Sequence, residues 1–129
     1  MTTFALIRHA AHGLLGDTIV GRTPGVALSA EGLEEAEQLA ARLAASRVEV
    51  VYSSPFERAH RTAEKIAGRL GLEVQIADEL NELDFGDWTN QKLTDLHALE
   101  EWRQFNRFRS GSRVPNGEAM IEVQCRLLR

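Results

Sequence analysis

Two arginines and a histidine occupy positions where an α/β chain could bring them together. Arg8 and His9 follow a short apolar run, and Arg58 comes soon after Ser53 and Ser54, which end a second apolar run. In open α/β sheets, ligands bind outside the carboxyl ends of the strands. Guanidinium groups hold phosphate through paired hydrogen bonds, and free N–H groups at the start of a helix add donors. The pattern therefore predicts an anion site in which His9 is the one strong neutral nucleophile at pH 7.

The first elements that would position these side chains follow from the hydrophobic pattern. Residues 4–7 form an apolar run that ends abruptly at Arg8, which predicts a buried strand that leads into a loop. Residues 13–27 are rich in glycine and predict a long loop with many turns. Ser29 is expected to cap a helix whose apolar residues recur at helical spacing as far as Leu43.

A second helix is predicted between two further strands. The β-branched residues 48–52 and the alternating residues 72–76 each predict a strand. Between them, Ser54 and Pro55 are typical of the cap and first turn of a helix, and Gly71 is typical of its end. Because strands and helices alternate and the linkers are short, we expect an α/β sandwich with a largely parallel sheet.

Beyond the third predicted strand the pattern changes. Residues 78–91 are polar and predict a loop, whereas residues 92–108 and 118–129 predict helices. Trp102 and Phe105 fall on one side of the first of these helices, interleaved with arginines. A nucleic-acid-binding face is the alternative to an aromatic core here, and the formal net charge of −4 favours the core.

Composition limits the classes of protein that remain. The chain has 129 residues, of which 43% are apolar and 26% charged, as expected for one globular domain over residues 1–129 and not for a disordered chain. A single cysteine, Cys125, excludes an internal disulfide framework, and its apolar neighbours predict a small core residue. Residues 1–8 lack the pattern of a signal peptide, so we expect a reduced, cytoplasmic location. Neither nucleic acid nor a membrane is an expected partner.

The motifs taken together resemble the histidine phosphatase superfamily, also called the phosphoglycerate mutase-like family. The resemblance spans the whole chain, and its blocks occur in the family's order. The matching blocks are Leu6-Ile7-Arg8-His9-Ala10, Gly21-Arg22-Thr23-Pro24, Leu28-Ser29-Ala30-Glu31-Gly32, Ser53-Ser54-Pro55-Phe56-Glu57-Arg58-Ala59-His60-Arg61-Thr62-Ala63, residues 80–88 and Asn116-Gly117-Glu118. The resemblance implies a three-layer α/β/α fold of the phosphoglycerate mutase-like type.

The resemblance also assigns roles to the catalytic residues. His9 would attack phosphorus and become a phosphohistidine, while Arg8 and Arg58 would hold the phosphoryl oxygens as charge spreads over them. Glu82 would protonate the leaving oxygen, with a pKa raised by partial burial near Leu83 and Phe85. The implied enzyme is a metal-independent phosphomonoester hydrolase that needs no cofactor.

The same resemblance indicates how the substrate would be bound. The block of Gly21, Arg22 and Thr23 is expected to bind a small phosphorylated substrate, with Arg22 at the entrance of the site. Thr62 is expected to pack within its helix instead of contacting the ligand. A metal site formed by His9, His12 and Asp17 is the less favoured interpretation of the histidines.

Two departures from the family pattern leave alternatives open. Ala10, Ala11 and His12 stand where family members commonly carry Gly-Glu followed by Ser or Thr, and no Ser-His-Gly element supplies the family's second catalytic histidine. A phosphoglycerate mutase-type phosphotransferase and a non-catalytic phosphate-binding protein therefore remain alternatives to a phosphatase. The missing element and the unpartnered apolar face predicted for residues 118–129 lead us to expect a domain that is incomplete at its C-terminus.

Overall fold

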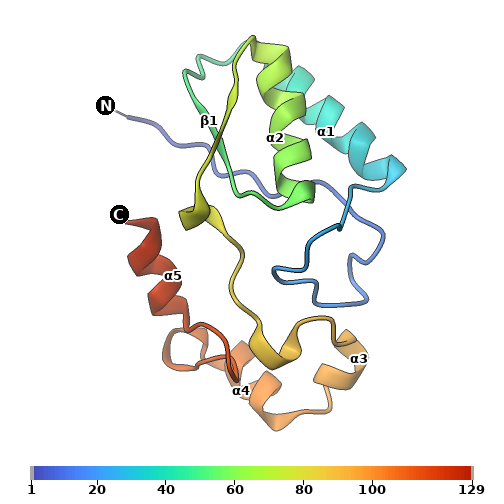
Figure 1. Ribbon diagram of the computed structural model, residues 1–129, viewed down its shortest axis with the longest axis vertical. Coiled ribbons are helices and arrows are strands. Elements are labelled where there is room, and N and C mark those ends of the chain that lie inside the picture. Colours follow the sequence, from blue (N-terminus) through green and yellow to red (C-terminus); the bar gives the residue numbers. More distant parts are fainter. Residues whose placement is uncertain (1, 129) are drawn as a thin grey trace.

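Two helices of equal length pack against each other and against a small sheet. The computed structural model describes residues 2–128. Helix α1 (Ala30–Leu43) begins where predicted, because the Ser29 hydroxyl accepts a hydrogen bond from the Gly32 N–H at 3.1 Å. Helix α2 (Glu57–Leu70) packs on α1 through small buried side chains and ends at Gly71, whose φ of 68° confirms the predicted cap. Figure 1 shows the two helices side by side.

The sheet has two parallel strands within the described residues. Strand β1 (Val51–Ser53) pairs with β2 (Val74–Ile76), with Val51 opposite Val74. Helix α2 connects the strands and packs on both. The β-α-β order with parallel pairing confirms the predicted α/β class, although each strand is shorter than predicted and β1 lies later than residues 48–52.

The predicted strand at residues 4–7 is not formed. The segment is extended but belongs to no strand, and its side chains are largely exposed, with Phe4 82% and Leu6 94% accessible. A buried strand needs a neighbouring strand for its backbone hydrogen bonds and an apolar cover for its side chains. Among residues 2–128, nothing supplies either to this segment. An apolar run shows that burial would be favourable, but it does not provide the partner.

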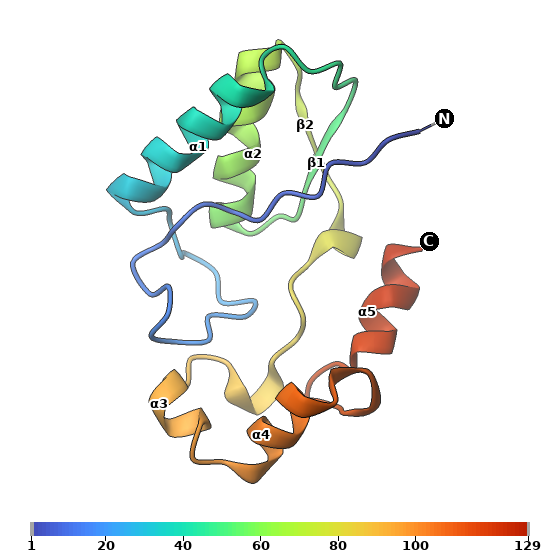
Figure 2. The same ribbon diagram turned by 180° about the vertical axis from the view of Figure 1, so that it is seen from behind.

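The second half of the described chain is built around aromatic side chains. Three short 3₁₀ turns and three helices follow the sheet: Asp78–Leu80, Gly86–Trp88 and Arg109–Gly111, and α3 (Leu93–Leu96), α4 (Glu100–Arg107) and α5 (Met120–Leu127). Trp88 meets Trp102 and Phe105 edge to face, with ring centroids 5.2 and 5.4 Å apart, and Leu96 and Val114 complete this core. Trp102 and Phe105 are therefore core residues, as predicted. Figure 2 shows α3 and α4 at one end of the molecule, α1, α2 and the sheet at the other, and α5 running back from the first end toward the middle.

Three local predictions are wrong. Helix α2 begins at Glu57 with Phe56 as its cap, so Ser54 and Pro55 precede the helix instead of starting it. Residues 92–108 form two helices, α3 and α4, because the chain turns between Leu96 and Glu100. Cys125 is exposed, since α5 turns part of its apolar face away from the aromatic core. No helix among the described residues has the length and apolar character needed to cross a membrane.

Candidate active site

Arg58 is a buried cation with unused hydrogen-bond donors. It lies on the first turn of α2 and is 2% exposed. Its Nη2 donates to the Gly21 carbonyl oxygen at 2.6 Å, whereas Nε and Nη1 are buried and have no partner within residues 2–128. Burial lowers the pKa of Arg58, and the nearby charge of Glu82 acts in the opposite direction; the guanidinium stays protonated near neutral pH. Two nitrogens of a fixed cation therefore keep hydrogens that can be donated to an anion such as phosphate.

The His9 ring is oriented by the backbone carbonyl group of the next residue, Ala10. Its Nδ1 lies 2.9 Å from the Ala10 carbonyl oxygen, and the side chain is only partly exposed. Because a carbonyl oxygen can only accept, Nδ1 must carry the hydrogen of this bond. In the neutral ring, Nε2 then carries the lone pair, which is the form that a nucleophilic imidazole needs.

His12 lies beside His9. The two imidazole centroids are 5.4 Å apart, and the His12 Nδ1 accepts a hydrogen bond from the Leu14 N–H at 3.3 Å. Burial lowers the pKa of His12, and positive charge on His9, Arg58 and Arg8 lowers it further. Positive charge from all three predicted residues thus reaches His12, whereas the Arg8 side chain itself is exposed, so their gathering around one phosphoryl group stays a prediction.

A metal site is not formed at these histidines. Within residues 2–128, no three His, Cys, Asp or Glu side chains gather closely enough to hold a metal ion. The alternative grouping of His9, His12 and Asp17 is therefore not found.

Thr62 connects the loop after His9 to the start of α2. Its hydroxyl accepts a hydrogen bond from the buried Ala10 N–H at 3.1 Å and donates to the Arg58 carbonyl oxygen at 2.8 Å. One residue further on, the Ala11 carbonyl oxygen accepts from the Ser29 N–H at 3.0 Å. The backbone next to His9 is thus held against the starts of both long helices. Thr62 packs within its helix as predicted, and its hydroxyl also binds this loop.

Glu82 lies on the loop between the first two 3₁₀ turns. Its side chain is exposed, so the predicted partial burial near Leu83 and Phe85 is wrong for the carboxyl group, although Leu83 itself is buried. The Glu82 Oε1 accepts a hydrogen bond from the Leu83 N–H at 2.8 Å. The negative charge of Glu82 raises the pKa of Arg58, against the effect of burial.

The predicted substrate-binding block is bound largely to the protein itself. Gly21 has a φ of 48° and offers its carbonyl oxygen to Arg58, and the Thr23 hydroxyl donates to Asn90 at 2.9 Å. Arg22 donates from Nε to the Glu82 carbonyl oxygen at 2.8 Å. The block therefore shapes the wall of the site, and its contact with a substrate stays a prediction.

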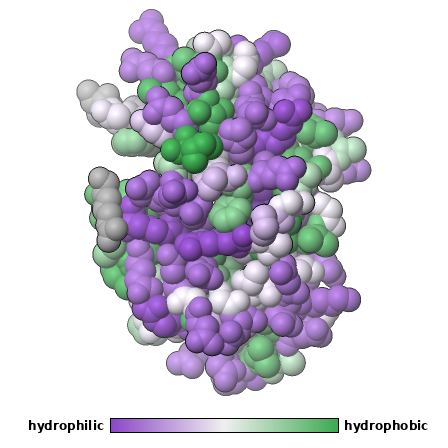
Figure 3. All heavy atoms as spheres, in the orientation of Figure 1, coloured by the Kyte–Doolittle hydropathy of each residue, from purple (hydrophilic) through white to green (hydrophobic). Residues whose placement is uncertain are grey.

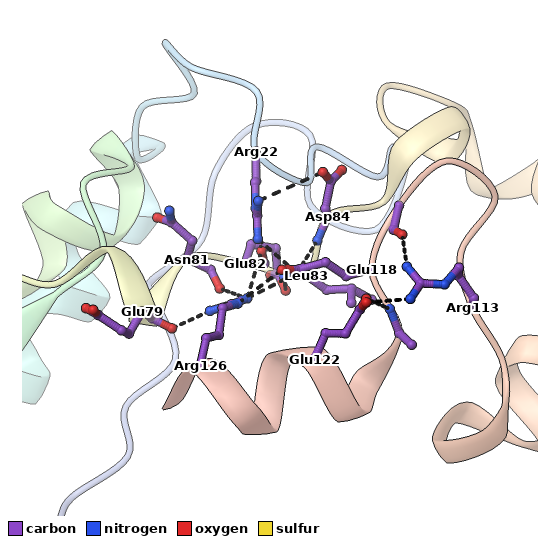
Figure 4. A network of polar contacts seen from close by, with 12 residues as sticks. Arg22, Glu79, Asn81, Glu82, Leu83, Asp84, Arg113, Glu118, Glu122 and Arg126 are labelled. Atoms are coloured by element: carbon purple, nitrogen blue, oxygen red, sulfur yellow. Dashed lines mark hydrogen bonds and ion pairs between the residues drawn. The ribbon is translucent and has the colours of Figure 1, made fainter. Parts of the chain in front are cut away.

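A charged network joins Arg22 to the C-terminal helix. Glu118 accepts from Arg22 Nη2 at 2.8 Å and from Arg126 Nε at 3.2 Å, and its Oε2 also accepts from the Asp84 N–H at 3.0 Å. Figure 4 shows Arg22 and Arg126 on either side of the segment that carries Glu82. In the view of Figure 3, strongly hydrophilic residues cross the middle of the molecule.

Sequence reasoning missed Arg126 and saw Glu118 only as part of a family block. Glu118 lies just before α5 and Arg126 lies within it, eight residues further on. This spacing is only a weak signal that the two side chains meet. The partner Arg22 is 96 residues away from Glu118, and no local pattern predicts such a pair.

Comparison with known families decides the assignment. The model of the histidine phosphatase superfamily (branch 1) matches residues 4–129. The chain belongs to this superfamily.

The curated relatives include proteins named as phosphatases and proteins named as probable phosphoglycerate mutases. The chain is 30% identical over 132 residues to phosphoserine phosphatase 1 of Hydrogenobacter thermophilus, an alignment that covers 98% of this chain and 61% of that protein. It is 36% identical over 91 residues to the adenosylcobalamin/alpha-ribazole phosphatase of Escherichia coli K12. That alignment covers 70% of this chain and 45% of that protein. The chain therefore spans about half to three-fifths of the length of these relatives.

Solved structures of the superfamily have the same fold. The alpha-ribazole phosphatase of Shigella flexneri superposes with a TM-score of 0.81 at 30% identity, covering 95% of this chain and 62% of that one. The mycobacterial glucosyl-3-phosphoglycerate phosphatase gives a TM-score of 0.81 at 26% identity, covering 92% and 56%. These likenesses confirm the predicted phosphoglycerate mutase-like α/β fold and the family. The roles of His9, Glu82 and the arginines stay predictions.

Proposed function

We propose that this chain carries the phosphate-binding and nucleophilic part of a phosphomonoester hydrolase. The observation that carries the proposal is Arg58, a buried guanidinium with two N–H groups that no described protein atom accepts. The residue after His9 is hydrogen-bonded to Thr62, which in turn is bonded to the Arg58 backbone. An anion held by Arg58 would therefore lie within the same rigid unit as the imidazole.

The proposed reaction has two steps. The His9 Nε2 lone pair forms a bond to phosphorus while the bond from phosphorus to the ester oxygen breaks, and the Glu82 carboxyl group gives its proton to that oxygen. Arg8 and Arg58 hold the non-bridging oxygens as charge spreads over them. Water then attacks the phosphohistidine, Glu82 takes its proton, and the N–P bond breaks to release inorganic phosphate and free His9.

The proposed substrate is a small phosphomonoester. Relatives of this chain are named for phosphoserine, alpha-ribazole and glucosyl-3-phosphoglycerate, which supports this class. The arginines supply positive charge to the phosphoryl group, so the proposed mechanism needs no metal ion.

Release of inorganic phosphate from p-nitrophenyl phosphate tests the proposal. We expect the unmodified chain to release phosphate in the presence of EDTA, and His9→Ala to abolish the release. The matched control is His97→Ala, because His97 is exposed at the end of α3. Rapid quenching followed by mass spectrometry should find an acid-labile phosphoryl group on the peptide that contains His9. Full activity of His9→Ala, or activity that EDTA removes and Mg²⁺ restores, would refute the mechanism. Binding of phosphate without any turnover would favour the non-catalytic alternative.

A further inference from the structure

The loop that carries Glu82 is held by side chains instead of by regular secondary structure. Arg126 donates from Nη1 to the Glu79 carbonyl oxygen, and from Nη2 to the carbonyl oxygens of Asn81 at 2.6 Å and Glu82 at 3.3 Å. Arg22 reaches the Glu82 carbonyl oxygen from the opposite direction at 2.8 Å. Figure 4 shows both guanidinium groups converging on this short stretch of backbone. The position of Glu82 therefore depends on two arginines from distant parts of the chain.

Glu118 is the group that allows the two arginines to share this backbone. Two guanidinium groups that bind one carbonyl oxygen repel each other. The Glu118 carboxylate accepts from Arg22 at 2.8 Å and from Arg126 at 3.2 and 3.3 Å, so it lies between the two positive charges. The side chains of Glu118 and Arg126 are only 20% and 14% exposed, so solvent screens this repulsion weakly.

Glu118 also binds the far side of the same loop. Its Oε2 accepts from the Asp84 N–H, and its own N–H donates to the Asp84 carbonyl oxygen, both at 3.0 Å. Burial raises the pKa of Glu118, but the hydrogen bonds from Asp84 and Arg126 and the charges of both arginines bring it below the ordinary value. The carboxylate is therefore charged at neutral pH and fixes the loop on both sides of Glu82.

We propose that Glu118 is a positioning residue for the general acid: with Arg22 and Arg126 it holds residues 79–84 so that Glu82 meets the leaving oxygen of the substrate. This inference rests on the proposed function, because it assigns Glu82 the role of proton donor. Glu118 need not touch the substrate. It acts through the geometry of the loop, and displacement of a reacting group by about 1 Å can cost on the order of 10²-fold in rate.

A misplaced general acid lowers kcat by a factor that depends on the leaving group of the substrate. Glu118→Gln keeps the shape of the side chain but removes its charge. We expect kcat for β-glycerol phosphate, whose alkoxide leaves poorly, to fall about 10²-fold, and kcat for p-nitrophenyl phosphate to fall less than about tenfold. Glu122→Gln is the matched control, because Glu122 lies on the first turn of α5, close to Glu118 in the chain, and its ion-pair partner is Arg113 instead of Arg22 or Arg126. It should leave both rates unchanged.

A double variant separates positioning from a general loss of structure. In a Glu82→Gln background, Glu118→Gln should cause no further loss on β-glycerol phosphate, because the acid that it positions is already gone. Amide hydrogen exchange across residues 79–84 should accelerate in Glu118→Gln and not in Glu122→Gln. If Glu118→Gln does not fold, Arg126→Lys provides the same test, since lysine keeps the charge but loses the planar fork.

The possible outcomes distinguish the inference from the proposed function. If Glu118→Gln lowered kcat equally on both substrates, or if its effect multiplied with that of Glu82→Gln in the double variant, the positioning role would be overturned. The proposed phosphatase function would still stand. Unchanged exchange in residues 79–84 would also overturn the positioning role. An unmodified chain that hydrolyses neither substrate would refute the proposed function instead, and hydrogen exchange would then still decide whether Glu118 holds the loop.

Discussion

Replacing Thr62 with valine tests how the loop beside His9 is held. Thr62 is 3% exposed, and valine has nearly the same shape, so the substitution removes a hydroxyl group without opening a cavity. The buried Ala10 N–H then loses its partner. The Arg58 carbonyl oxygen keeps the hydrogen bond of the helix ladder, so only one group is left unpaired. An unsatisfied buried donor costs about 1–3 kcal/mol.

Urea denaturation followed by circular dichroism measures this cost. With a slope of about 1–3 kcal/mol per molar urea for a small domain, a loss of about 2 kcal/mol lowers the midpoint by roughly 1 M. Thr62→Ser is the control, because it keeps the hydroxyl and removes one methyl group, at a cost of about 0.8 kcal/mol. We therefore expect the order wild type, Thr62→Ser, Thr62→Val from most to least stable. If valine were as stable as threonine, or serine were the weaker variant, the hydrogen bond to Ala10 would not be what fixes this loop.

Two further predictions concern packing and pH. Gly32→Ala should lower the melting temperature, because a Cβ there would lie 1.9 Å from the Ala11 carbonyl oxygen and overpacking costs about 1–3 kcal/mol. Gly68→Ala should instead raise the stability by up to about 1 kcal/mol, because Gly68 lies on the open side of α2 and a Cβ there would meet no other atom. The pKa of His12 is lowered from 6.5 by burial and by neighbouring positive charges, so below pH 6.5 the unfolded chain takes up a proton that the folded chain does not. Urea titrations should therefore show wild-type stability falling from pH 7 to pH 5, and His12→Gln should show a smaller fall; equal slopes would contradict the assignment.

Features that depend on neighbouring residues in the chain could be predicted from the sequence. The start of α1 at Ser29 and the end of α2 at Gly71 follow from the hydrogen bonds and backbone angles of those residues themselves. The expectation that Arg8, His9 and Arg58 share one site rested on parallel strands that end at a common edge, and it stays a prediction because residues 4–7 form no strand. The local pattern placed the start of α2 two residues too early, since Ser54 and Pro55 carry the signal of a helix start that the chain does not use.

Features that depend on distant residues could not be predicted. The apolar run at residues 4–7 and the apolar face of α5 signal burial, but burial needs a partner that the run itself does not specify. The network around Glu118 joins residues separated by up to 96 positions, and the charged groups of each segment alone look like ordinary surface residues. Glu82 is exposed although its neighbour Leu83 is buried in the aromatic core, and this difference depends on the distant residues that form that core.

The placement of the two tryptophans separates the spectroscopic signals of the two ends of the molecule. Trp88 and Trp102 both lie in the aromatic core beside α3 and α4, and the chain contains no other tryptophan. Their fluorescence therefore reports on that end alone, whereas the far-ultraviolet dichroism arises largely from the 14-residue helices α1 and α2. Coincident transitions from the two probes would mean that both ends unfold as one cooperative unit. Separate transitions would assign each midpoint to one end without any added label.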